Sequence, residues 1–157
     1  MRQAKAQEVA TRISEDISRL EAVNAKIVES LKLIKSKNKY KPHEFDRFVT
    51  ATASELQDFY TGIEAVIEKI IKFKTGQIPT GKSSHLELLG LAKDQKIIDE
   101  TQHTFLRRLS ALRHFVRHAY GKELDSETVK DGAAQTIHQW PGIKAAMTKH
   151  QTDIYST

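Results

Sequence analysis

The residues with the clearest chemical potential lie within eight consecutive positions. The run RHFVRHAY contains Arg113, His114, Arg117, His118 and Tyr120. Arginine and histidine together can cleave RNA without a metal ion. A neutral imidazole takes the proton of a ribose 2′-hydroxyl, an imidazolium protonates the leaving oxygen, and a guanidinium holds the phosphate with two hydrogen bonds. The run therefore predicts acid–base chemistry on a phosphodiester, for which no carboxylate is required.

A helix is needed to position these side chains, and the apolar residues around them predict one from about Asp99 to Tyr120. Apolar side chains recur at steps of four and three residues, which places them on one buried stripe of a helix. The stripe consists of Phe105, Leu109, Leu112, Val116 and Ala119. Off the stripe, at ~100° per residue, lie Arg107, Arg113, His114, Arg117, His118 and Tyr120. We expect these polar groups to face solvent or a partner.

Positive charge is concentrated on the same helix. Between Phe105 and Lys122 there are five arginine or lysine residues, two histidines and no acidic residue, in a chain whose net charge is +5. A basic run of this kind is most often a solvated face, and that interpretation remains the alternative. His114 and His118 have the spacing of a metal-binding pair, but neighbouring arginines and the lack of a nearby acid disfavour a divalent cation. We therefore predict no metal and no cofactor.

Composition indicates one helical domain. The 157 residues fit a single domain spanning residues 1–157, and the seven glycines and three prolines leave few positions for hairpin turns. An all-β fold is nearly excluded. The chain has no cysteine, which excludes disulfides, a thiol nucleophile and thiolate zinc sites. Because the sequence shows neither a signal peptide nor a membrane-spanning apolar run, we expect a cytoplasmic protein with no membrane partner.

Two long helices are predicted before the basic one. The first runs from about Lys5 to Lys35, where apolar residues repeat mainly at three, four and seven. Pro42 is well placed to open the second, because the first position of a helix does not need an amide hydrogen. Apolar residues continue along the second helix to Ile70. The similar lengths predict that these helices pack antiparallel.

A loop is predicted over residues 75–84, which contain two glycines and a proline. From Gly76 to Ser83 the loop also matches the phosphate-binding pattern of glycine, four residues and Gly-Lys-Ser. That pattern requires a buried strand before the loop, whereas residues 64–72 continue a helical period. Nucleotide binding by this loop is therefore disfavoured, and a short helix through Leu91 is expected after it.

The last part of the chain predicts two further helices. Asp125 or Ser126 is placed to begin the first of them. The sequence Trp140-Pro141-Gly142 is expected to interrupt that helix, because proline lacks an amide hydrogen and clashes with the preceding turn. A short final helix is expected after the interruption.

The motif from Arg113 to Tyr120 resembles the signature of the HEPN family. The pattern is an arginine, a polar residue, three variable residues and a histidine, extended here to His-x-Tyr. More closely, the chain is similar to the HepT-like ribonuclease toxins, with His114 standing where asparagine is common. Further matching segments are Phe-Tyr-x-Gly-Ile-Glu at 59–64, Ile-Pro-x-Gly-x-x-x-His-x-x-Leu-Leu at 78–89, and Gly-Lys-Glu-Leu-Asp at 121–125. His85, in the second segment, could reach the cleft that the motif residues would form.

The resemblance implies an antiparallel all-α HEPN bundle with two long N-terminal helices and a third long helix that carries the motif. It implies a metal-independent endoribonuclease that is the toxin of a toxin–antitoxin system. This enzyme would cleave tRNA or mRNA by transesterification, in which the ribose 2′-hydroxyl of the RNA attacks the phosphate. Arg113 and His118 would be catalytic, supported by His114, Arg117 and Arg107. A nucleotidyltransferase antitoxin of the MntA type would neutralise the toxin by transferring AMP to Tyr120, because added phosphate charge repels RNA.

A homodimer is implied by the resemblance and is consistent with helix geometry. Arg113 and His118 are five residues apart, about 140° around a helix, so one helix does not easily direct both at one phosphate. A two-fold related copy can complete the site. His118 near the negative end of the helix dipole would suit a general acid, with its symmetry mate as base. The alternative is a non-catalytic HEPN module that docks a nucleotidyltransferase and positions its substrate.

Overall fold

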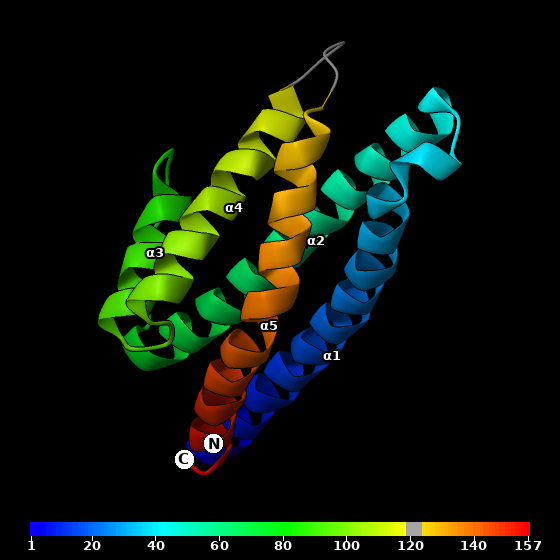
Figure 1. The fold of residues 1–157 in the computed structure, drawn as a ribbon. Coiled ribbons are helices and arrows are strands. Elements are labelled where there is room, and N and C mark those ends of the chain that lie inside the picture. The colour runs from blue at the N-terminus through cyan, green and yellow to red at the C-terminus, as the bar shows by residue number, and fades with distance from the viewer. Residues whose placement is uncertain (119–123) are drawn as a thin grey trace.

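The protein is a bundle of five α-helices (Figure 1). The computed structural model describes residues 1–118 and 124–157, and of residues 114–118 it describes the backbone alone. The helices are α1 (Arg2–Lys35), α2 (Pro42–Thr75), α3 (Ser84–Asp94), α4 (Glu100–His118) and α5 (Ser126–Tyr155), with a short 3-10 turn, η1 (Lys37–Lys39), between α1 and α2. The all-α fold, the two long N-terminal helices and the long helix under the motif are as predicted.

Helices α1 and α2 form the antiparallel pair that the sequence predicts. Each has 34 residues, and Pro42 is the first residue of α2. The two helices approach closely at Gly62, where an added Cβ would lie 2.6 Å from a methyl carbon of Leu20. Further along the pair, the Nζ atom of Lys69 donates to a carboxylate oxygen of Asp16 at 2.5 Å. Packing and an ion pair therefore fix the register of α1 against α2.

Helices α3 and α4 pack against α2 and against each other (Figure 1). The loop over residues 76–83 connects α2 to α3, and α2 itself runs to Thr75, so the phosphate-loop pattern follows a helix rather than a strand. A reciprocal cap begins α4. The amide of Gln102 donates to Oδ1 of Asp99 at 2.7 Å, and the amide of Asp99 donates to Oε1 of Gln102 at 3.0 Å. This pair satisfies two amide hydrogens that the first turn leaves free.

Helix α5 corrects one prediction. Asp125, one of the two residues expected to begin it, caps it, but the helix continues through Pro141 to Tyr155 as one element of 30 residues. An interior proline costs roughly 3 kcal/mol. The residues on both sides of it, Trp140 and Ile143, are buried against the rest of the bundle. Since burying a large apolar side chain contributes roughly 1.5–3 kcal/mol, packing outweighs the cost of the proline.

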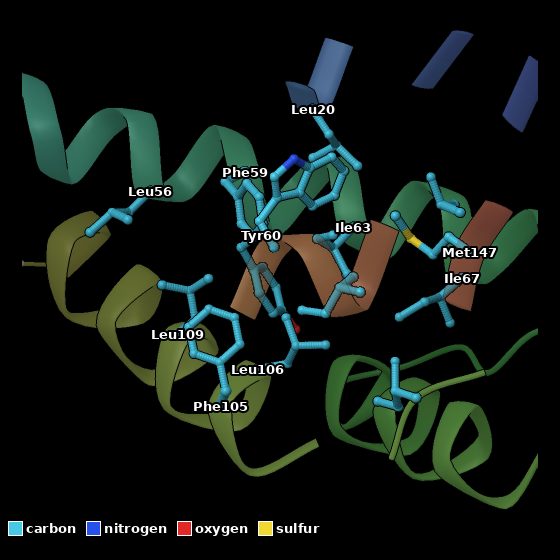
Figure 2. Packing of buried hydrophobic residues seen from close by; sticks show 14 of the residues in the cluster. Leu20, Leu56, Phe59, Tyr60, Ile63, Ile67, Phe105, Leu106, Leu109 and Met147 are labelled. Carbon is cyan, nitrogen blue, oxygen red and sulfur yellow. The ribbon is translucent and has the colours of Figure 1, made fainter. Parts of the chain in front are cut away.

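One hydrophobic core joins the helices, and α2 contributes more of its described residues than any other helix. Figure 2 shows Phe59, Tyr60 and Ile63 of α2 among Leu106 and Leu109 of α4 and Met147 of α5. Tyr60 is fully buried and reaches from α2 toward α4. Of the helices that the structure describes, none combines the length and the apolar character needed to span a bilayer.

Candidate functional site

The motif helix α4 packs through the part of the predicted stripe that the structure describes, which excludes the side chain of Val116. Phe105 and Leu109 are buried and Leu112 is partly buried, and Leu106, which the stripe did not include, is also buried. Arg107 is exposed, as expected. The backbone of His114, Arg117 and His118 belongs to α4, but their side chains lie outside the described residues. Tyr120 lies outside them altogether, as do Ala119 and Gly121.

Arg113 points into the protein rather than outward as the helical wheel predicts. Its side chain is 18% exposed, and its Nη1 atom lies 3.5 Å from Oε1 of Glu64 on α2. Its guanidinium carbon lies 5.6 Å from the centroid of the Tyr60 ring, a cation–π distance. The ion pair uses one of the five N–H donors of the guanidinium. The remaining donors include those that a phosphate would need for bidentate binding.

Glu64 contacts three side chains from three helices. Its side chain is 8% exposed. Besides the ion pair with Arg113, Oε2 accepts a hydrogen bond from the hydroxyl of Tyr60 at 3.2 Å and lies 2.5 Å from Nδ1 of His85, in the first turn of α3. The two carboxylate oxygens therefore bring the guanidinium of Arg113 and the imidazole of His85 close together.

Tyr60 acts as a permanent donor in this cluster. Burial raises the pKa of its hydroxyl well above the ordinary value, and the nearby Ser110 and Arg113 oppose that shift only in part. The phenol therefore remains protonated at any pH at which the protein would work. Glu64 thus receives a hydrogen bond from α2 itself in addition to its contacts with α3 and α4.

Glu64 was not predicted as a site residue, although it lies in the matching segment 59–64. The signal was present in the spacing, because Glu64 stands four residues after Tyr60 and one after Ile63, on the buried face of α2. An acidic residue in such a position is rarely buried without a partner. The partners themselves, His85 and Arg113, could be found only from the packing.

A basic groove adjoins the cluster. It has a volume of about 670 Å³ and lies over the start of α3 and the outer face of α4. Of the eight described residues that line it, four are basic and none is acidic. The basic ones are Lys82, His85, Arg107 and Arg108. Ser110 also lines it, so the groove extends to the residues beside Tyr60. A groove of this charge suits a polyanion such as the backbone of RNA.

A second cavity, of about 590 Å³, lies between the start of α1 and the end of α2. It too is lined by basic residues, but two of them are already paired: Arg12 with Glu8, and Lys69 with Asp16. Arg113, the motif residue whose side chain the structure describes, does not line it. We therefore place the candidate site at the groove over α3 and α4.

Two of the three segments that resembled one family in the sequence meet the motif residue Arg113 in this structure. Glu64 lies in the first of them and His85 in the second, and both contact or adjoin Arg113 of the motif. No curated protein and no solved structure matches the chain significantly. The sequence model of one family, described as HepT-like protein, matches residues 51–154, which include α3, α4 and most of α2 and α5. The chain therefore belongs to the HepT-like family.

Proposed function

We propose that the protein is a metal-independent endoribonuclease and the toxin of a toxin–antitoxin pair. Membership of the HepT-like family supports this function. The observation that carries it is the placement of Arg113, which shares the carboxylate of Glu64 with His85, a lining residue of the basic groove. An arginine held in this way binds a phosphodiester without reorganising as charge develops on the phosphate.

In the proposed reaction the ribose 2′-oxygen attacks the adjacent phosphorus and the bond to the 5′-oxygen breaks. Arg113 stabilises the charge on the phosphate, and His118 protonates the departing 5′-oxygen. The sequence predicts that His118 lies in the last turn of this helix, where the negative end of the helix dipole would favour an imidazolium. The products are a 2′,3′-cyclic phosphate and a free 5′-hydroxyl. Arg107, His114 and Arg117 hold the RNA.

We further propose that two copies form the working site and that Tyr120 is its control point. A two-fold axis would bring two copies of the motif to one cleft. A nucleotidyltransferase antitoxin of the MntA type would transfer AMP to Tyr120, and the added charge would repel RNA. Incubation with such an enzyme and ATP should add the mass of one AMP to the wild type but not to Tyr120→Phe.

The function is tested with the wild type, His118→Ala and a control, His138→Ala, whose histidine is exposed on α5. Each purified protein is incubated with total RNA in excess EDTA. Cleavage by the wild type and by His138→Ala, but not by His118→Ala, is the expected result. If none of the three cleaves RNA while all are folded, the nuclease function is wrong, and a non-catalytic module that docks a nucleotidyltransferase becomes the better explanation.

A further inference from the structure

The pair formed by Glu64 and His85 resembles the carboxylate–imidazole arrangement of a general base. Oε2 of Glu64 lies 2.5 Å from Nδ1 of His85, in a carboxylate that is 8% exposed. The imidazole itself is 51% exposed and lines the basic groove. One side of the ring is therefore fixed inside the protein, while the other side faces the space in which we place RNA.

The contact with Glu64 determines which nitrogen of His85 can accept a proton. An ionised carboxylate only accepts hydrogen bonds, so Nδ1 must carry a hydrogen. In the neutral ring Nε2 then has the free lone pair, since the hydrogen bond of one nitrogen sets the role of the other. Nε2 is the ring nitrogen that does not contact Glu64, and the half-exposed ring lines the groove.

The carboxylate of Glu64 holds this imidazole close to Arg113, which is the proposed phosphate site. The guanidinium of Arg113 and the imidazole of His85 bind different oxygens of one carboxylate. A phosphodiester held by Arg113 would thus present its neighbouring ribose close to His85. The charged groups around the imidazole come from three parts of the chain. They are Glu64 of α2, Lys82 of the loop before α3, and Arg107, Arg108 and Arg113 of α4.

We propose that His85 is the general base of the RNA cleavage and that Glu64 is its positioning residue. Nε2 of His85 removes the proton of the 2′-hydroxyl as the bond between the 2′-oxygen and phosphorus forms. His118 donates its proton to the 5′-oxygen as the bond from that oxygen to phosphorus breaks. The proton gained by His85 later passes to water. This inference rests on the proposed nuclease function, and it replaces a second copy of His118 as the base.

The test measures single-turnover cleavage of a labelled single-stranded RNA oligonucleotide in EDTA, as a function of pH. The variants are His85→Gln, whose amide can still donate to Glu64, and the control His138→Gln. A positioned general base contributes about 100- to 10,000-fold to the rate, and His85→Gln should lose that factor. It should also lose the rising limb of the pH–rate profile, while binding of the oligonucleotide and the control remain unchanged.

A modified substrate separates the base from the acid. An RNA with sulfur in place of the bridging 5′-oxygen has a leaving group that departs without protonation. His118→Ala should therefore cleave this substrate at close to the wild-type rate, whereas His85→Gln should remain slow. Recovery of His85→Gln, rather than His118→Ala, would overturn the assignment of His85 as base.

The role of Glu64 has a separate readout. Glu64→Gln should lower the single-turnover rate of the wild type but add no further loss in the His85→Gln background, because Glu64 acts through the imidazole, whereas a purely structural role would lower both rates by the same factor. A His85→Gln rate within about threefold of wild type, beside an inactive His118→Ala, would refute the inference alone. A wild type that fails to cleave any RNA would refute both the inference and the nuclease function.

Discussion

Replacing Glu64 by glutamine should destabilise the protein by about 2–3 kcal/mol. Hydrogen bonds to a charged group contribute roughly 1.5–3 kcal/mol each, and Glu64 receives them from Tyr60 and His85 and also pairs with Arg113. Breaking a fully buried ion pair costs roughly 3–5 kcal/mol. The value here is lower because the partly exposed guanidinium and imidazole can bind water again, and because an amide retains some of the contacts.

Urea unfolding followed by circular dichroism measures this change. The midpoint should fall with an unchanged slope, since the surface exposed on unfolding is the same. In a chain of this size the melting temperature should fall by about 5–10 °C. Glu68→Gln is the matched control, because Glu68 lies one turn further along α2 with an exposed side chain. Its unfolding free energy should stay within about 0.5 kcal/mol of the wild type.

A double-mutant cycle isolates the contact with Arg113. Combining Glu64→Gln with Arg113→Gln should destabilise less than the sum of the two single changes, with a coupling of about 1–2 kcal/mol. Independent effects of the two substitutions would refute the ion pair. A Glu64→Gln variant as stable as the Glu68→Gln control would refute the whole description of Glu64 as the residue that joins three helices.

Two further predictions concern the bundle itself. Trp140→Phe removes the hydrogen bond of 2.6 Å from the indole to Glu21 that is the main cause of the lowered pKa of this carboxyl. The wild type should thus lose stability relative to the variant as pH falls below 4.5 toward the pKa of Glu21 in the folded protein. A difference in urea midpoints that does not change with pH would contradict this. Gly62→Ala should destabilise by about 1 kcal/mol net, because crowding against the buried Leu20 exceeds the gain in helix propensity. Gly90→Ala, whose Cβ would meet nothing within 4 Å, should instead stabilise by about 0.5–1 kcal/mol, and equal effects of the two would argue against the close approach of α1 and α2.

Local sequence signals predicted most of the helices. These signals act within a few residues, so they can be read without the tertiary structure. They are the spacing of three and four residues between apolar side chains, Pro42 at the first position of α2, and Asp125 at the cap of α5. Pro141 was read by the same local rule, and there the prediction of an interruption was wrong. The proline is retained within α5 because its neighbours on both sides are buried, and burial depends on the other helices.

Some features of the candidate site could likewise be predicted from the sequence, and others depended on how the helices pack. Residue types and spacing determined the helical class, the basic character of α4 and the motif from Arg113 onward, because chain neighbours define these features. Only the tertiary structure decided that Arg113 turns inward, that Glu64 is its partner and that His85 shares the same carboxylate. These three residues come from separate helices, and their distances depend on how α3 and α4 pack on α2. A buried carboxylate needs partners but does not specify them in the sequence, because any donor that the packing brings within reach can satisfy it.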